Sequence, residues 1–193
     1  MNEKEFQSRN KRFIKKIGYD KTFKKLTNSW FIRSVKHEYS YHFRWLGVPI
    51  IQYPQDIIAY QEIIWKVKPD LIIETGIARG GSLILSASIL EIIGKGKVLG
   101  IDIDIHKENR KAVERHPLSK RIHMLEGSSI SSEIIRYVQR IARDKKKILV
   151  TLDSNHTHEH VLEELRLYSP LVSKGSYVIV FDSIRSEEHT SEL

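Results

Sequence analysis

Between residues 70 and 183, short apolar runs alternate with stretches that carry helical periodicity. Five runs have the length and the β-branched content of buried strands: "DLIIET", "KVLGIDID", "RIHMLEG", "KKILVTLDS" and "SYVIVFDS". Four predicted helices separate these runs, and every connection is short. This alternation is typical of a doubly wound, mainly parallel α/β sheet with helices on both faces. A chain of 193 residues suits one such domain.

Polar residues gather where the predicted strands end. In open parallel sheets, ligands bind outside the carboxyl ends of the strands. The ends predicted here carry acids or Gly/Ser turns: Glu74 to Ser82, Asp102 to Asp104, Glu126 to Ser129, Asp153 to His158, and Asp182. A purely structural sheet does not require such residues, so we expect a ligand site at this edge of the sheet.

The turn after the first strand, "ETGIARGGS", narrows the choice of ligand. A phosphate-binding P-loop requires a lysine directly after its last glycine, but Ser82 follows Gly81. A dinucleotide-binding loop requires a second glycine two residues after Gly76, where Ala78 stands. What remains is the pattern E-x-G-x-x-x-G-x-S, which begins at Glu74.

This pattern resembles the first motif of the Rossmann-like, S-adenosylmethionine-dependent methyltransferases. The resemblance implies that Gly76, Gly80 and Gly81 let the backbone pass close to the amino-acid part of S-adenosylmethionine. The helix N-terminus and the Ser82 hydroxyl would hold its carboxylate, and Glu74 would accept a hydrogen bond from its ammonium group.

Two further strand ends match the same layout. Such enzymes place an acid on the ribose hydroxyls, a role that we assign to Asp102 with Asp104 in reserve. Gly127 and Ser128 would lie along the adenine. One glycine turn alone is equally typical of an ordinary strand-to-helix connection, but three matching strand ends in order are much harder to obtain by chance.

Two longer stretches sharpen the resemblance: "PIIQYPQDIIAYQEIIWKVKPDLIIETGIARGGS" and "LDSNHTHEHVLEELRLYSPLVSKGSYVIVFDS". They are similar to the cephalosporin hydroxylase-like family, which includes rhamnosyl O-methyltransferases, over roughly residues 40 to 184. The resemblance implies an O-methyltransferase acting on a hydroxyl of a sugar, a polysaccharide or a glycosylated natural product. Two other interpretations stay open: a degenerate methyltransferase-like binding module, and a hydroxylase as the family's name suggests.

The resemblance also implies roles for the last two strand ends. Related enzymes bind a divalent cation through an acid after the fourth strand and an acidic pair after the fifth. Asp153 and Asp182 match two of these metal-binding positions, but Phe181 stands at the third, so Mg²⁺ is an open expectation. His156 matches the position of a proposed general base, and we assign catalysis to His156 and Asp153. We expect these side chains to converge at the carboxyl edge of the sheet.

The stretch "HTHEH" also invites a zinc site built from His156, His158 and His160. We disfavour that site, because alternate histidines diverge once a helix begins. For His158 and His160 we favour solvated positions near a helix N-terminus. Candidate residues for the acceptor pocket precede the first strand of the sheet: Gln52, Tyr53, Gln55 and Asp56.

The first 36 residues differ in charge from the rest of the chain. They hold eleven Lys/Arg and three Asp/Glu, a net charge of +8, and the remaining residues sum to zero. We predict a basic helical segment over 1–36. It is either a solvated helix whose apolar side docks on the domain or an arm for an acidic surface. Residues 37–184 form the expected S-adenosylmethionine-binding domain.

The remaining expectations concern location and the end of the chain. No apolar run reaches the ~20 residues of a membrane helix, and the N-terminus has no secretory signal pattern. With no cysteine present, disulfides and thiolate metal sites are excluded, and we expect a cytoplasmic protein without a transmembrane segment; a homo-oligomer stays open. The last nine residues, "RSEEHTSEL", match a sequencing-library adapter when read back through the genetic code. We therefore expect 185–193 to be a non-native tail and the methyltransferase sheet to lack its last strands.

Overall fold

The computed structural model describes residues 1–182, so the predicted non-native tail, 185–193, lies outside the described residues. The chain divides into two units, Met1–Ser40 and a second unit that begins at Tyr41. The boundary predicted from charge lies slightly earlier, after residue 36. None of the helices within the described range is long and apolar enough to cross a membrane.

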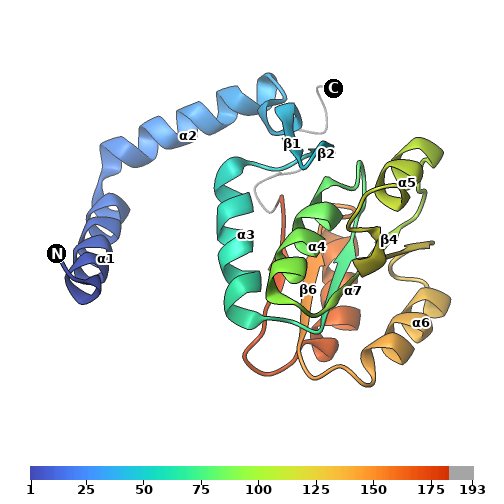
Figure 1. Ribbon diagram of the computed structural model, residues 1–193. Coiled ribbons are helices and arrows are strands. Elements are labelled where there is room, and N and C mark those ends of the chain that lie inside the picture. The colour runs from blue at the N-terminus through green and yellow to red at the C-terminus, as the bar shows by residue number, and fades with distance from the viewer. Residues whose placement is uncertain (183–193) are drawn as a thin grey trace. The chain divides into compact units, whose positions relative to one another are not determined.

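The first unit consists of two helices, α1 (Glu3–Tyr19) and α2 (Lys21–Lys36), shown in blue in Figure 1. Asn2 and Glu5 form a capping box at the start of α1, in which each side chain accepts the other residue's backbone N–H. Asp20 lies between the helices, and its carboxylate accepts a backbone N–H from the first turn of α2 at 2.9 Å. The predicted basic helical segment is therefore two helices with a capped break.

The second unit is an α/β domain whose sheet confirms the predicted alternation (Figure 1). All neighbouring strands are parallel, in the order β5-β4-β3-β6-β7. The strands are β3 (Leu71–Thr75), β4 (Lys97–Asp102), β5 (Ile122–Glu126), β6 (Ile148–Leu152) and β7 (Val178–Val180). The helices are α3 (Pro54–Val67), α4 (Gly81–Ile93), α5 (Lys107–Glu114), α6 (Ser132–Ala142) and α7 (His158–Tyr168). Short 3₁₀ helices cover Tyr39–His42, Ser119–Arg121 and Ser169–Leu171.

The order of the strands fixes where a ligand can bind. The chain moves outward from β3 through β4 to β5, and then returns to the other side of β3 with β6. This reversal leaves a crevice at the carboxyl ends of β3 and β6, which is where ligands of such sheets bind.

Helices cover both faces of the sheet. Alternate residues of a strand point to opposite faces, so Ile72 clusters with side chains of α3 and α4, whereas Ile73 clusters with those of α6 and with Tyr168 of α7. The strands β3 and β6 are buried along their whole length, as expected for central parallel strands covered on both sides. These two strands form a rigid base for the site at their carboxyl ends.

A small hairpin precedes the sheet and was not expected from the sequence. Strand β1 (Phe43–Trp45) pairs antiparallel with β2 (Val48–Ile50). Leu46 and Gly47 form the turn, with φ angles of 45° and 88°. A tight two-residue hairpin turn of this kind requires positive φ at both positions. Leucine rarely adopts that conformation, so the sequence carried no strong turn signal.

Candidate active site

The loop between β3 and α4 is held tightly against the neighbouring strand ends. Gly76 has a φ of +87°, and a Cβ added there would lie 2.0 Å from the backbone oxygen of Asp153, which follows β6. The Asp153 amide donates to the Thr75 oxygen at 2.9 Å, and the Gly76 amide donates to the Ile101 oxygen at 2.8 Å. Only glycine fits at position 76, and the loop begins in contact with the ends of both adjacent strands.

The helix α4 begins with backbone amides that no side chain caps. Gly80 is the N-cap residue and forms no side-chain hydrogen bond. Gly81 lets the hairpin approach, because a Cβ added there would lie 2.3 Å from the Pro49 oxygen. The Trp45 indole N–H donates to the Ser88 hydroxyl at 3.0 Å, which fixes the hairpin on α4. Open amides at a helix start suit a carboxylate, the group predicted to bind there.

Asp102, at the end of β4, holds the glycine loop in place. Its Oδ2 accepts the backbone amides of Ile77 at 2.7 Å and Ala78 at 3.2 Å, and its Oδ1 accepts that of Asp104 at 3.3 Å. The ribose role assigned to Asp102 stays a prediction. The structure adds a second task that sequence reasoning missed, since this carboxylate also shapes the loop. Asp104, the reserve candidate, is largely exposed.

A cavity of about 1210 Å³ opens beside Asp102. Its wall includes loop residues 78–79, the start of α5 and Glu126 at the end of β5. Gly127 and Ser128, predicted to line the adenine, directly follow Glu126. The backbone amide of Gly127 donates to the backbone oxygen of Asp102 at 2.7 Å. Pockets for drug-sized ligands typically measure about 300–1,000 Å³, so this cavity has room for a nucleoside.

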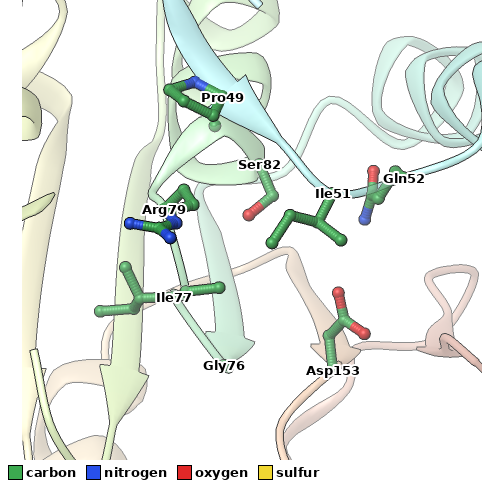
Figure 2. A pocket seen from close by; sticks show the side chains of 10 residues that line it. Pro49, Ile51, Gln52, Gly76, Ile77, Arg79, Ser82 and Asp153 are labelled. Atoms are coloured by element: carbon green, nitrogen blue, oxygen red, sulfur yellow. The ribbon is translucent and has the colours of Figure 1, made fainter. Parts of the chain in front are cut away.

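A smaller cavity of about 30 Å³ shares Ala78 and Arg79 with the large one. Figure 2 shows Gln52 from the segment after β2, Ser82 from the start of α4, and Asp153 around this space. Its volume admits roughly one water molecule or the end of a ligand group. A ligand lying along the glycine loop therefore has one cavity for a large end and another for a small polar end.

Glu74, the acid of the glycine motif, is only 2% exposed. The Ser82 hydroxyl donates to its Oε1, whereas Oε2 has no hydrogen-bond partner within residues 1–182. Burial raises the pKa of Glu74 to about 7, and the hydrogen bond from Ser82 opposes that rise. The sequence predicted separate ligand contacts for these two side chains, but here they are bonded to each other, and one Glu74 oxygen is left without a partner in the described residues.

The predicted catalytic residues come together where β6 and β7 end. The His156 Nε2 lies 4.0 Å from the Asp153 Oδ1 and 3.6 Å from the Asp182 Oδ2. Asp56, in the first turn of α3, has its pKa raised by burial and by the negative charge of Asp182. The imidazole is thus flanked by two carboxylates, and such an arrangement suits a group that takes up a proton.

A family model described as Rhamnosyl O-methyltransferase/CmcI matches residues 37–192. The chain belongs to this family. The family resemblance drawn from the sequence over residues 40 to 184 is therefore confirmed. Because the matched range includes most of 185–193, the non-native origin of that tail stays a prediction.

Curated relatives within the rhamnosyl O-methyltransferase/CmcI family are about one-third identical to this chain over the 141 aligned residues. The Rhamnosyl O-methyltransferase of Mycobacterium bovis is 36% identical over 141 residues, which cover 72% of this chain and 56% of that protein. Its Mycobacterium leprae counterpart is 36% identical over 141 residues, which cover 59% of its length. The chain thus spans somewhat more than half the length of these curated relatives.

Solved structures of CmcI have the same fold as this chain. A CmcI structure named as its Mg-SAM form matches with a TM-score of 0.57 and 20% sequence identity, covering 75% of this chain and 59% of that one. The predicted Rossmann-like fold of the S-adenosylmethionine-dependent methyltransferases is confirmed.

The described residues of this family member do not complete a metal site. No three His, Asp or Glu side chains within residues 1–182 are arranged to hold a metal ion. Phe181, at the third expected ligand position, packs edge-on against Tyr60 with 5.8 Å between ring centroids, and it lies against the core. Asp153 and Asp182 remain predicted ligands for Mg²⁺.

His160 is not solvated, contrary to the expectation from the sequence. Its side chain is 17% exposed, and its Nε2 lies 3.2 Å from the hydroxyls of both Ser129 and Ser154. Glu164 is fully buried, lies 3.4 Å from His160 and accepts from the Ser154 hydroxyl at 2.7 Å. This network joins the turn after β5 to the turn after β6. The only sequence signal was the i, i+4 spacing of His160 and Glu164 on α7.

Replacing Asp102 with alanine is expected to weaken the binding of S-adenosylhomocysteine by about tenfold or more. A hydrogen bond from a ribose hydroxyl to a charged carboxylate contributes about 1.5–3 kcal/mol. The variant also removes the acceptor of the Ile77 and Ala78 backbone amides. Calorimetric titration of the variant measures the change. Asp104→Ala serves as the matched control, because the Asp104 side chain is 73% exposed. Equal losses in the two variants would contradict the assignment to Asp102.

Replacing Glu74 with glutamine is expected to flatten the pH dependence of stability. The pKa of Glu74 is raised from 4.5 to about 7, so the folded state holds a proton that the unfolded state releases between these values. This contribution is fully present below pH 4.5 and is lost as the pH rises through 7, a loss of at most about 3 kcal/mol. Thermal midpoints at pH 5 and pH 8 should therefore differ more in the wild type than in Glu74→Gln.

The control for this charge change is Glu62→Gln, at an exposed position on α3. It should keep the pH dependence of the wild type. If Glu74→Gln loses as much stability between the two pH values as the wild type does, Glu74 is not the group that titrates.

Proposed function

We propose that this protein is an S-adenosylmethionine-dependent O-methyltransferase that methylates a hydroxyl group of a sugar. One observation carries the proposal: Asp153 lines the small cavity at the glycine loop and also lies 4.0 Å from the Nε2 of His156. A proton-accepting side chain therefore sits next to one end of a two-part ligand site. Membership of the rhamnosyl O-methyltransferase/CmcI family supports the same conclusion.

The residues of the site fit S-adenosylmethionine. The large cavity beside Asp102 has the size and polar walls for adenosine. The small cavity suits the amino-acid end, because Gln52 lines it with an amide that has no hydrogen-bond partner among the described residues. When bound, S-adenosylmethionine supplies an electrophilic methyl group on its sulfonium sulfur.

The chain's own residues have defined tasks in methyl transfer. His156 takes the proton of the acceptor hydroxyl at its Nε2, so that the acceptor oxygen can form the new C–O bond as the S–C bond breaks. The negative charges of Asp153 and Asp182 lie 4.0 Å and 3.6 Å from this nitrogen and stabilise the imidazolium that forms. The imidazolium then returns its proton to water. The glycine loop, shaped by Asp102, fixes the approach of the methyl group to the acceptor.

The sugar class rests on the curated relatives, which are named rhamnosyl O-methyltransferases. The chain spans 56% of the length of the Mycobacterium bovis relative. The basic unit formed by α1 and α2 suits contact with an acidic surface, and this role stays a prediction.

A transfer assay tests the proposal. The chain is incubated with S-adenosylmethionine labelled on the methyl group and with p-nitrophenyl rhamnoside, and catechol serves as the comparison acceptor. We expect label in the rhamnoside. Cofactor binding without transfer to any glycoside would support the binding-module interpretation, and a hydroxylated product without label would support the hydroxylase interpretation.

A further inference from the structure

Gln52 is a buried side chain without an obvious structural task. It is 6% exposed, and neither its amide nitrogen nor its amide oxygen has a hydrogen-bond partner within residues 1–182. Buried polar groups in folded proteins are nearly always hydrogen-bonded, because an unpaired one loses its interaction with water and gains nothing. An amide left unpaired beside a cavity therefore indicates that a bound ligand supplies the missing hydrogen-bond partner.

The backbone around Gln52 holds this side chain in place. The residue follows β2, whose Ile50 is buried and whose Pro49 oxygen lies against Gly81. It precedes α3, which begins at Pro54. The segment is thus fixed at both ends, on α4 and at the start of α3. In this packed segment the Gln52 side chain is 6% exposed and lines the small cavity.

The charges around the small cavity determine which ligand group fits there. Asp153 lines the cavity, and Figure 2 shows its carboxylate pointing toward the segment that carries Gln52. Glu74 lies behind Ser82 and has one oxygen without a partner in the described part of the chain. The Asp153 carboxylate favours an ammonium group and disfavours a carboxylate. A ligand that carries both groups needs neutral donors for its carboxylate beside this acid, and the open amides at the start of α4 are one such set.

Gln52 is the buried side chain that supplies such a donor. Its amide nitrogen can donate two hydrogen bonds, and its amide oxygen can accept from an ammonium group. Arg79 also lines this cavity, but it is exposed and lines the large cavity as well. The amide therefore matches a zwitterionic α-amino acid group better than it matches a simple anion or cation.

We infer that Gln52 is a cofactor-positioning residue that holds the α-amino acid end of S-adenosylmethionine in the small cavity. The inference rests on the proposed function and deepens it, because it assigns a residue outside the glycine motif to the cofactor. It also departs from the sequence-based expectation, which placed Gln52 in the acceptor pocket. Holding the amino-acid end fixes the position of the sulfonium along the glycine loop.

Two nucleosides separate this role from its alternatives. S-adenosylhomocysteine carries the amino-acid end, whereas 5′-methylthioadenosine has the same adenosine and thioether but lacks it. Calorimetric titration of both into the full chain is compared for the wild type and Gln52→Leu. We expect the variant to bind S-adenosylhomocysteine about tenfold more weakly or worse, and 5′-methylthioadenosine with less than a twofold change.

Three controls make the result specific. Gln139→Leu changes an exposed glutamine on α6 that lines neither cavity, and it should leave both affinities unchanged. Gln52→Glu keeps the side-chain shape but replaces the donor with an acid, so it should weaken S-adenosylhomocysteine at least as strongly. The thermal midpoint of ligand-free Gln52→Leu should equal or exceed that of the wild type, because the variant removes an unpaired buried amide.

The outcomes are distinguishable. Equal losses for both nucleosides in the two Gln52 variants, or no loss for either, would overturn the inference and leave the proposed function standing. Unchanged nucleoside affinity with weakened binding of p-nitrophenyl rhamnoside would return Gln52 to the acceptor pocket and also overturn it. If the wild-type chain binds neither nucleoside, the proposed function fails and this inference fails with it.

Discussion

His156→Ala is expected to lower the rate of methyl transfer by about 10²–10⁴-fold, the range typical for loss of a general base. The acceptor hydroxyl would then have to lose its proton to water while it attacks the methyl group. The affinity for S-adenosylhomocysteine should stay nearly unchanged, because His156 lines neither of the two cavities assigned to the cofactor. Single-turnover rates with a labelled methyl donor measure the effect.

His158→Ala is the matched control, since His158 lies two residues further along the chain and is exposed. It should retain the rate of the wild type. Full turnover in His156→Ala would show that this histidine only orders the start of α7, and that the proton acceptor lies elsewhere. A shift of the pH–rate profile in Asp182→Asn would show in addition that the flanking carboxylate tunes the base.

Gly76→Ala is expected to lower the thermal midpoint by about 10 °C or more, or to prevent folding. A Cβ at this position would lie 2.0 Å from the backbone oxygen of Asp153, so the end of β6 must move. The positive φ of +87° adds a conformational cost of roughly 1–2 kcal/mol. In a domain of this size, each kcal/mol corresponds to about 2–4 °C.

Gly94→Ala separates the steric clash from the conformational cost of the positive φ. Gly94 has nearly the same φ, +85°, but a Cβ added there meets nothing within 4 Å. It should therefore show only the conformational cost, and a smaller loss of thermal midpoint than Gly76→Ala. Calorimetric unfolding of both variants gives the comparison. Equal midpoints for the two would mean that the loop at Gly76 relaxes freely and is not held against β6.

The sheet could be predicted from the sequence because its signals are local. Buried parallel strands read as continuous apolar runs, and each run is followed by a helix of regular periodicity. The hairpin of β1 and β2 was missed, because its turn places Leu46 at a φ of 45° without the Asn-Gly or Asp-Gly pair that marks such turns. The break at Asp20 was missed because both flanking segments are equally basic and helical.

The candidate site could be predicted as a set of residues but not as a set of contacts. The strand ends gave Glu74, Asp102 and Asp153 directly, because parallel strands deliver their ends to one edge. The sequence could not show that Asp102 accepts the loop amides or that Glu74 is buried with Ser82, since both depend on packing between distant segments. The burial of His160 beside Glu164 could not be predicted for the same reason, because it also depends on packing between distant segments.

The central claim is that the glycine loop and the end of β4 form a site for S-adenosylmethionine and not for a dinucleotide. Calorimetric titration of S-adenosylmethionine and of NAD into the wild-type chain tests it most directly. We expect one S-adenosylmethionine bound per chain, displaced by S-adenosylhomocysteine, and no heat from NAD at the same concentrations. Saturable binding of NAD without binding of S-adenosylmethionine would contradict it.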